Sequence, residues 1–331
     1  TAIGWNALYS NNGSQNTATG INAMGYNTTG GNNTAVGMAA LHKNTTGGVN
    51  TAIGRCVMAN NTTGCQNVGL GAQTLQYVTT GCGNTASGYA AMLYVCAGAN
   101  FNTAHGFKAL QGANTYTANY NTAVGACALQ ANTTGGCNTG LGMQAMASNT
   151  TGNQNTATGY QALYATTSGS YNTASGYRSL FSATTGGYNT SYGRTSMYSN
   201  TTGTQNVALG MHSLHGNTTA SCNTAVGYAS LHCSTTGSEN TAVGRFALYT
   251  NTTGTQNVAI GNGAACLNTT GSANVALGVC ALAVNTTGSN NTATGFCALR
   301  LNTTAGYNTA YGRSALSQNT TGAKNTGVGY L

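Results

Sequence analysis

The segment that decides the fold is Asn240-Thr-Ala-Val-Gly-Arg-Phe-Ala-Leu-Tyr-Thr-Asn-Thr-Thr-Gly-Thr-Gln256, one copy of a 17-residue unit that fills the chain. If the unit is numbered from its first Asn, position five is Gly, position nine is Leu and positions twelve to fifteen are Asn-Thr-Thr-Gly. The Gly at position five recurs every 17 residues from Gly125 to Gly329. Such a short period is typical of a solenoid, in which a unit buries its apolar residues only when its neighbours stack on it.

The length of the repeat varies only before Gly125. From Gly4 to Gly125, the intervals between successive position-five glycines are 16, 17, 17, 17, 17, 18 and 19 residues. We expect loops near residues 11–16 and 93–120 to absorb these differences within a single repeat domain over residues 1–331. Because Thr1 already lies inside a repeat, we expect a piece of a longer chain or a filament subunit, with both solenoid ends uncapped and open to further stacking.

The composition of the unit favours strands over helices. Seventeen residues are too few for two helices with their connections, and Gly, Asn and Thr are poor helix formers. Two short strands with Gly and Asn turns fit the unit easily. The sequence therefore predicts an all-β fold, a parallel β-solenoid or β-roll with one 17-residue repeat per coil and about 19 coils. Each coil should rise by about 4.8 Å.

Position one is Asn in all nineteen units that contain it, from Asn16 to Asn325. A ladder in which each side-chain amide bonds to the next one along the axis requires such an invariant residue. The sequence predicts this structural ladder, with Asn138, Asn155, Asn172, Asn189, Asn206 and Asn223 among its members.

The repeat also indicates which side chains share a face. Whenever position two is Val instead of Thr, position four is Leu or Ile, as in Val207 and Leu209. Side chains two apart on a strand share a face, so positions two and four should share an environment, and the Ala or Gly at position three should face closely approaching atoms on the other side. Position nine is Leu or Met in all but one complete unit, and it predicts the core, with members Leu163, Leu214, Leu248 and Leu282.

Two further positions carry large aromatic and basic side chains. Position six mixes aromatics with Arg, which indicates an outward column available for surface contacts, formed by Tyr160, Tyr177, Arg194, Tyr228 and Arg245 among others. Position ten carries Tyr or His in several units and predicts a second column that includes Tyr164, Tyr198, His215, His232 and Tyr249.

Charge is scarce, at 3% of the residues, with nine basic residues against one acid, Glu239. The net charge of +8 is scattered singly, whereas nucleic-acid-binding proteins concentrate Lys and Arg in patches. No apolar run approaches the length of a membrane span. We therefore expect neither a nucleic-acid partner nor a membrane span.

The residues available for chemistry are few. A single carboxylate excludes a paired acid and base mechanism, so we expect a non-enzymatic protein with no catalytic residue and no cofactor. His212, His215 and His232, with Cys233, could ligate a metal, but the pattern favours surface residues in a tolerant column, and we expect no metal site.

Among eleven cysteines, Cys65 and Cys82 share position sixteen and Cys280 and Cys297 share position seven of successive units. These pairs predict either axial disulfides or free thiols that act as small apolar residues.

Three units carry a phrase that points to a family. Asn206-Val-Ala-Leu-Gly210, Asn257-Val-Ala-Ile-Gly261 and Asn274-Val-Ala-Leu-Gly278 resemble the head repeats of the YadA-like trimeric autotransporter adhesins. The complete unit resembles β-solenoid repeats of bacterial and phage-type tail-fibre proteins. The resemblance implies a parallel β-roll, usually homotrimeric, that acts in surface attachment. This sequence departs from the adhesin head in its additional Ala-Leu and Asn-Thr-Thr-Gly elements.

These patterns predict an extracellular structural or adhesive fibre protein, located outside the cell, on a cell surface or in a virion fibre. Its expected partners are other copies of itself, as a homotrimer or a head-to-tail filament, and glycans or a host or abiotic surface. The alternative is an ice-binding β-solenoid. Paired Thr columns at positions thirteen and fourteen, as in Thr252-Thr253, could order water, although adjacent strand residues face opposite sides and only one column can be outward.

Overall fold

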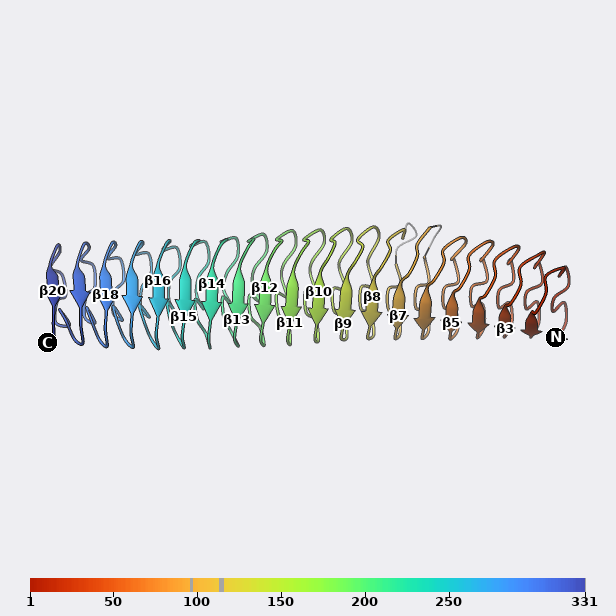
Figure 1. Ribbon diagram of the computed structural model, residues 1–331, viewed down its shortest axis with the longest axis horizontal. Helices are drawn as coiled ribbons and strands as arrows, with labels where there is room; N and C mark the ends of the chain where they lie inside the picture. The colour runs from red at the N-terminus through yellow and green to blue at the C-terminus, as the bar shows by residue number, and fades with distance from the viewer. Residues whose placement is uncertain (96–97, 113–115, 331) are drawn as a thin grey trace. The chain divides into compact units, whose positions relative to one another are not determined.

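The structure is a computed structural model that describes residues 1–95, 98–112 and 116–330. The chain forms two compact units, Thr1–Ser170 and Tyr171–Leu331. Within the described residues the regular elements are short β-strands, and no helix occurs (Figure 1). A single repeat domain over residues 1–331 stays a prediction.

The first unit contains ten parallel strands in its described residues. They are β1 (Ala2–Ile3), β2 (Thr17–Thr19), β3 (Thr34–Val36), β4 (Thr51–Ile53), β5 (Val68–Leu70), β6 (Thr85–Ser87), β7 (Thr103–His105), β8 (Thr122–Val124), β9 (Thr139–Leu141) and β10 (Thr156–Thr158). Strands that are neighbours in the sequence pair in register, so that Thr122 lies opposite Thr139 and Val124 opposite Leu141. One repeat therefore makes one coil.

The second unit repeats this arrangement. Its strands are β11 (Thr173–Ser175), β12 (Thr190–Tyr192), β13 (Val207–Leu209), β14 (Thr224–Val226), β15 (Thr241–Val243), β16 (Val258–Ile260), β17 (Val275–Leu277), β18 (Thr292–Thr294), β19 (Thr309–Tyr311) and β20 (Thr326–Val328). Val207 pairs with Thr224, and Leu209 with Val226, in parallel. These pairings confirm the predicted fold class, an all-β parallel β-solenoid with one 17-residue repeat per coil.

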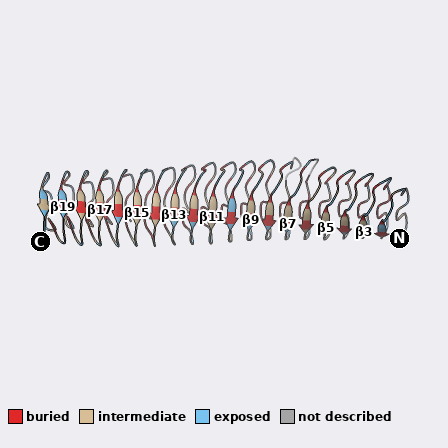
Figure 2. Ribbon diagram, viewed as in Figure 1, coloured by how far each residue is buried: buried red, intermediate tan, exposed pale blue. Residues whose placement is uncertain are grey.

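The predicted alternation of faces is confirmed. The middle residue of every strand from β2 to β19 is buried (Figure 2), whereas positions two and four are half-buried or exposed. A methyl group added to Gly140, at position three, would lie 3.5 Å from both Leu129 Cγ and Met146 Cε, two side chains at position nine. The small residue at position three therefore faces the core that position nine fills. The four predicted core residues are fully buried: Leu163, Leu214, Leu248 and Leu282.

The invariant Gly at position five is required by both conformation and space. Gly244 has a φ of 132°, a region that residues with a Cβ rarely adopt. A Cβ at Gly244 would also lie 2.6 Å from the carbonyl oxygen of Gly261, the same position of the next coil. Only glycine allows the backbone to turn here while the coils stay stacked.

The rest of the turn is made by residues that do carry a Cβ. Positions seven, nine and seventeen adopt the left-handed conformation, as in Phe246 (φ 57°), Leu248 (φ 49°) and Gln256 (φ 59°). This conformation costs about 1 kcal/mol or more for each such residue. Burial and inter-coil hydrogen bonding must offset that cost in every coil.

The irregular repeats keep their strands in register. Ala2 pairs with Ala18, Thr85 with Thr103 and Thr103 with Thr122, at separations of 16, 18 and 19 residues. The differences in length therefore lie outside the strands, although residues 96–97 and 113–115 of the predicted 93–120 loop region lie outside the described residues. Near this region the buried Tyr116 hydroxyl donates to Asn102 Oδ1 at 2.9 Å and accepts from Asn121 Nδ2 at 3.0 Å.

Candidate functional site

The Asn residues at position one, here called the first ladder, form the predicted asparagine ladder in each unit. In the first unit Asn138 Oδ1 accepts a hydrogen bond from the backbone N–H of Asn155 at 2.9 Å and another from its Nδ2 at 3.2 Å. Asn155 Nδ2 also donates to the carbonyl oxygen of Gly169 at 2.8 Å. Both asparagines are fully buried, so each amide joins two coils in a place that water does not reach.

The second unit contains the same chain of bonds. The backbone N–H groups of Asn189, Asn206 and Asn223 each donate to Oδ1 of the asparagine 17 residues earlier, at 3.0 Å. Their Nδ2 groups reach the same oxygens at 3.1, 3.2 and 3.2 Å. The first ladder thus satisfies a backbone donor at the start of each of these strands.

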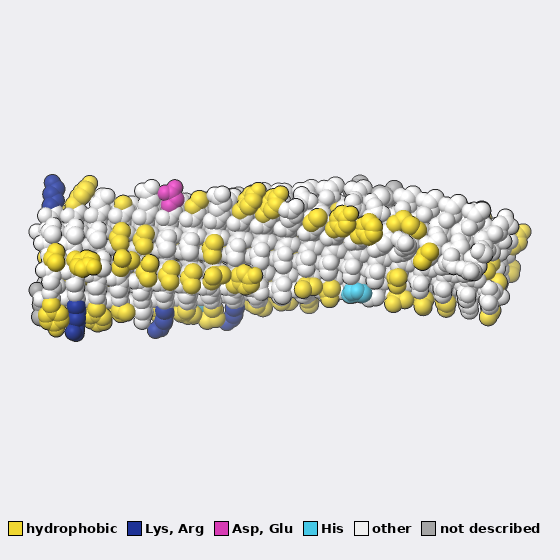
Figure 3. Space-filling model, viewed as in Figure 1, with side chains coloured by type: hydrophobic (Ala, Val, Ile, Leu, Met, Phe, Trp, Pro, Cys, Tyr) yellow, Lys and Arg dark blue, Asp and Glu magenta, His cyan; other side chains and the backbone are white. Residues whose placement is uncertain are grey.

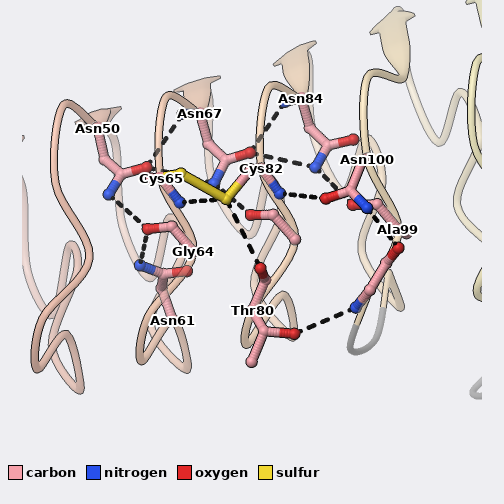
Figure 4. The surroundings of a disulfide bond; sticks show 12 residues. Asn50, Asn61, Gly64, Cys65, Asn67, Thr80, Cys82, Asn84, Ala99 and Asn100 are labelled. Carbon is pink, nitrogen blue, oxygen red and sulfur yellow. Dashed lines mark hydrogen bonds between the residues drawn. A yellow bond between two sulfur atoms is a disulfide. The ribbon is translucent and has the colours of Figure 1, made fainter.

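The Asn residues at position twelve form a second ladder, which the sequence analysis treated only as a turn. Asn61 Nδ2 donates to Asn44 Oδ1 at 2.7 Å, and to the Gly64 carbonyl at 3.0 Å. The Gly64 carbonyl also accepts from Asn50 Nδ2 of the first ladder at 2.9 Å (Figure 4). The two ladders therefore meet at one carbonyl in this coil, and the same arrangement recurs at the carbonyls of Gly47, Gly254 and Gly271. The recurrence of Asn at position twelve was the signal that could have found it.

The second ladder is interrupted, and each interruption leaves a buried oxygen unsatisfied. The side-chain oxygens without a hydrogen-bond partner in the described structure belong to Asn61, Asn149, Asn217 and Thr166, all at position twelve. Position twelve of the coil that follows each of the three asparagines is Val78, Thr166 and Ser234, respectively. Valine has no polar side-chain atom, and the shorter hydroxyl side chains of Thr166 and Ser234 make no hydrogen bond to the preceding Oδ1.

The second unit exposes large side chains on the outer side of its coils, and we call the set at positions four and six the outward face. At position four it includes the exposed residues Tyr192, Leu209, Ile260 and Tyr311. At position six the predicted contact residues Tyr177, Arg194, Tyr228 and Arg245 are exposed, whereas Tyr160, in the first unit, is half-buried. Figure 3 shows basic and hydrophobic side chains interspersed along one edge of this unit.

Cation–π contacts order the basic residues of the outward face. The Arg245 guanidinium lies 4.4 Å from the ring centroid of Phe246. Arg313 lies 5.5 Å from the Phe296 ring and 5.4 Å from the Tyr330 ring, both at position six of adjacent coils. Such contacts contribute about 0.5–1 kcal/mol at exposed sites, enough to limit the rotamers of these arginines.

The predicted column at position ten is a continuous ring stack in the second unit. Its rings are those of Phe181, Tyr198, His215, His232 and Tyr249, with successive centroids 5.1, 5.3, 5.0 and 5.0 Å apart and interplanar angles from 4° to 18°. Phe181 was missed by the sequence analysis, although it occupies the same position. Burial lowers the pKa of His215, and the nearby His232 and His212 lower it further.

The histidine group does not have the geometry of a metal centre. The rings of His215 and His232 are stacked, with centroids 5.0 Å apart and an interplanar angle of 7°. Because the nitrogen lone pairs lie in the ring planes, two stacked rings do not direct them at one ion, as tetrahedral zinc requires. The third ring, His212, is occupied by a 2.8 Å hydrogen bond between its Nδ1 and Thr195 Oγ1. No group of three or more His, Cys, Asp or Glu among residues 1–95, 98–112 and 116–330 is arranged to hold a metal.

The nearest Cys–His pair is poorly suited to nucleophilic chemistry. Cys233 Sγ lies 3.5 Å from His232 Nδ1. Burial raises the pKa of the Cys233 thiol and lowers the pKa of His232, which His212 lowers further. Both shifts oppose the thiolate–imidazolium pair on which cysteine catalysis depends.

One of the two predicted cysteine pairs is a disulfide in the structure. Cys65 and Cys82 are bonded across neighbouring coils, with their Cα atoms 4.7 Å apart (Figure 4). Cys280 and Cys297 are free thiols and half-buried. Parallel stacking of side chains therefore does not prevent an axial disulfide in this fold.

The chain matches no protein-family model, no curated protein and no solved structure. In the part of the chain that the structure describes, there is also no apolar helix of membrane-spanning length. The columns of exposed side chains and the asparagine ladders are therefore the features that bear on function.

Proposed function

We propose that this chain belongs to an extracellular structural or adhesive fibre and that its outward face is the binding surface. The observation that carries the proposal is the recurrence of exposed Tyr and Arg at position six, and of exposed Tyr, Leu and Ile at position four, in several coils of the second unit. Contiguous exposed apolar side chains mark interaction sites in soluble proteins. Tyr and Arg are also the residues most often found among those that dominate binding energy.

Three further observations support this proposal. The single carboxylate side chain, Glu239, is exposed and accepts a hydrogen bond from Gln256 at 3.0 Å, so the chain has no pair of carboxylates for acid–base catalysis. The Cys65–Cys82 disulfide is of a kind that persists in oxidising compartments outside the cytosol. The resemblance of Asn206–Gly210 to adhesin head repeats points to the same role.

The proposed partners follow from where the outward face lies. It runs along the side of the coils, so side-by-side association of copies, as in a homotrimer, would cover it more completely than head-to-tail stacking into a filament. Glycans or a host or abiotic surface would meet the same residues. The columns are ordered by stacking and by cation–π contacts, and ordered side chains lose less conformational entropy on binding.

The test compares two double variants made in the same two coils. Tyr228→Ser with Arg245→Ser removes two side chains of the outward face, and Thr236→Ser with Thr253→Ser changes two exposed residues at position fourteen. Analytical ultracentrifugation measures self-association, and a quartz crystal microbalance measures binding to glycan-coated and apolar surfaces. We expect the first variant to bind at least about tenfold more weakly than the unmodified protein. The second variant should bind as strongly as the unmodified protein. Equal binding by all three proteins would contradict the proposal.

Ice binding is the second candidate, and the Thr column at position fourteen favours it. Thr253, Thr270 and Thr287 are exposed in consecutive coils. At position thirteen, by contrast, the Thr252 hydroxyl donates to the Thr269 carbonyl at 3.1 Å, so this hydroxyl is already engaged. Thermal hysteresis that disappears in Thr270→Tyr would support ice binding, and its absence from the unmodified protein would exclude it.

A further inference from the structure

Side chains at position seven of neighbouring coils reach one another along the axis. In the first unit Gln161 Nε2 donates to Gln144 Oε1 at 2.7 Å. In the second unit Thr195 Oγ1 and His212 Nδ1 lie 2.8 Å apart. All four residues occupy position seven, and each pair is 17 residues apart. Position seven is therefore a place where consecutive coils can be joined by their side chains.

Cys280 and Cys297 occupy this position in two neighbouring coils. Their strands are in register, with Val275 opposite Thr292. The two cysteines share one backbone conformation, with φ values of 55° and 56°, so their side chains leave the backbone in the same direction.

The direction of the Cys280 sulfur is along the axis. Its Sγ lies 3.8 Å from the point where Gly263, at position seven of the preceding coil, would carry a Cβ. By the same repeat geometry, a Cys297 side chain in the same rotamer would direct its sulfur toward Cys280.

The Cys65–Cys82 bond shows that the coil spacing suits a disulfide. Its Cα–Cα distance of 4.7 Å lies within the range of about 4.4–6.8 Å in which disulfides form. Cys280 and Cys297 have the same sequence separation and the same in-register coils. The distance between their Cα atoms is set by the same strand spacing.

We propose that Cys280 and Cys297 are an oxidation site at which a second inter-coil disulfide forms by exchange with a low-molecular-weight disulfide such as oxidised glutathione. The thiolate of Cys280 attacks one sulfur of that disulfide, which breaks its S–S bond and releases one small thiol. The thiolate of Cys297 then attacks the Cys280 sulfur and releases the second small thiol. The two protons lost by the cysteines end on the two released thiols, and the small disulfide is the oxidant.

The register of the repeat selects the partner of Cys280. Cys297 occupies position seven of the next coil, whose strand is in register with that of Cys280, whereas Cys266 occupies position ten of the preceding coil. Burial and the nearby Cys280 raise the pKa values of both Cys297 and Cys266, so thiol acidity does not distinguish the two. The bond therefore forms between the in-register pair, Cys280 and Cys297.

The experiment maps disulfides in the folded protein after incubation with oxidised glutathione. The reaction is quenched with acid, free thiols are alkylated in denaturant and the protein is digested with chymotrypsin. Cleavage after Leu267, Leu282 and Phe296 separates Cys266, Cys280 and Cys297 into different peptides. A mixture of unlabelled and ¹⁵N-labelled protein distinguishes bonds within one chain from bonds between chains.

We expect a linked pair of peptides containing Cys280 and Cys297 from the same chain. Cys56 and Cys127 also occupy position seven but have no cysteine at that position in adjacent coils, so they should end as mixed disulfides or alkylated thiols. The linked pair should exceed any bond to either of them by about tenfold, because intramolecular reaction has the higher effective concentration. In Cys297→Ser, Cys280 should instead retain glutathione.

The inference is overturned if Cys280 and Cys297 carry glutathione or alkyl groups to the same extent as Cys56. It is also overturned if Cys280 is linked mainly to Cys266, or if the bond joins different chains. None of these outcomes depends on whether the chain is an adhesive fibre.

Discussion

The first and second ladders donate to the same carbonyls, yet they differ in whether other residues replace their asparagines. Position one is Asn in every unit that contains it, whereas position twelve is Val78, Thr166, Ala183 or Ser234 in some coils. The difference follows from what each amide satisfies. Asn189 Oδ1, in the first ladder, accepts both the backbone N–H and Nδ2 of Asn206. Asn200 Oδ1, in the second ladder, accepts only Nδ2 of Asn217.

The repeat position that never varies is therefore the one whose side chain accepts a hydrogen bond from a buried backbone N–H. Loss of a first-ladder amide leaves a buried backbone N–H without a partner, which costs about 1–3 kcal/mol in addition to the bonds lost. Loss of a second-ladder amide leaves one side-chain oxygen unpaired, as at Asn61, Asn149 and Asn217. The asparagine of the second ladder is therefore replaced in several coils, whereas the asparagine of the first ladder is present in every unit that contains position one.

The largest effect should come from breaking the first ladder with Asn206→Ala. This change removes the bonds to Asn189 Oδ1 and to the Ala220 carbonyl at 2.8 Å, and it leaves the Asn223 N–H unpaired. We expect the free energy of unfolding to fall by about 3–5 kcal/mol, measured by urea unfolding followed by circular dichroism. The control is Asn262→Ala at an exposed site, which should change it by about 0.5 kcal/mol or less. A similar loss in both variants would contradict the role of the first ladder.

A smaller loss is expected from breaking the second ladder with Asn268→Ala. The change removes the bonds from Asn268 Nδ2 to Asn251 Oδ1 and to the Gly271 carbonyl, each 2.8 Å, and the bond that Asn268 Oδ1 accepts from Asn285 Nδ2 at 2.7 Å. That carbonyl keeps the bond from Asn257 Nδ2 at 2.8 Å. Because the backbone stays satisfied, the same urea measurement should show a loss of about 1–2 kcal/mol. A loss equal to that of Asn206→Ala would remove the distinction between the ladders.

Repairing an interruption should stabilise the second unit by a similar amount. Ser234→Asn would place an amide where Nδ2 can donate to the unpaired Asn217 Oδ1, with the same backbone that holds Asn251 and Asn268. We expect a gain of about 1 kcal/mol from satisfying that oxygen, seen as a higher urea midpoint. Ser234→Ala is the matched control, since it changes the same position without adding a donor. If both variants unfold at the same urea concentration, the orphaned oxygen carries no penalty.

The smallest effect concerns pH, because the ladders contain no titratable group whereas the ring stack beside them does. The pKa values of His215 and His232 are lowered in the folded protein, mainly by burial, so the unfolded chain binds their protons first. Stability should be complete above about pH 6.5, the unfolded value, and should fall as the pH drops below it. In a variant with His215→Tyr and His232→Tyr, the urea midpoint should change less between pH 7 and pH 5. An unchanged pH dependence would show that the stack does not titrate with folding.

Much of the fold could be predicted because the repeat acts as its own alignment. The recurrence of Asn at position one predicted the first ladder, and the period of 17 predicted one coil per repeat. The pattern at positions two to four predicted that position three faces away from its two neighbours, and Leu at position nine predicted the core. Each of these features depends on a residue type that only one environment favours.

What could not be predicted depends on backbone conformation and on neighbouring coils. Leu248 adopts a left-handed φ, which nothing in a leucine side chain indicates. The orphaned oxygen of Asn217 depends on the identity of Ser234, one coil away. For the candidate site, the sequence predicted the columns at positions six and ten but not the ring stacking or the cation–π contacts, because those depend on rotamers.

The central claim is that successive 17-residue repeats lie directly over one another as parallel strands. X-ray diffraction from an aligned film of the purified protein tests it most directly. The account predicts a strong reflection along the fibre axis at about 4.8 Å, the distance between hydrogen-bonded strands. A pattern dominated instead by the helical spacings of about 5.4 and 1.5 Å, with no axial reflection near 4.8 Å, would contradict it.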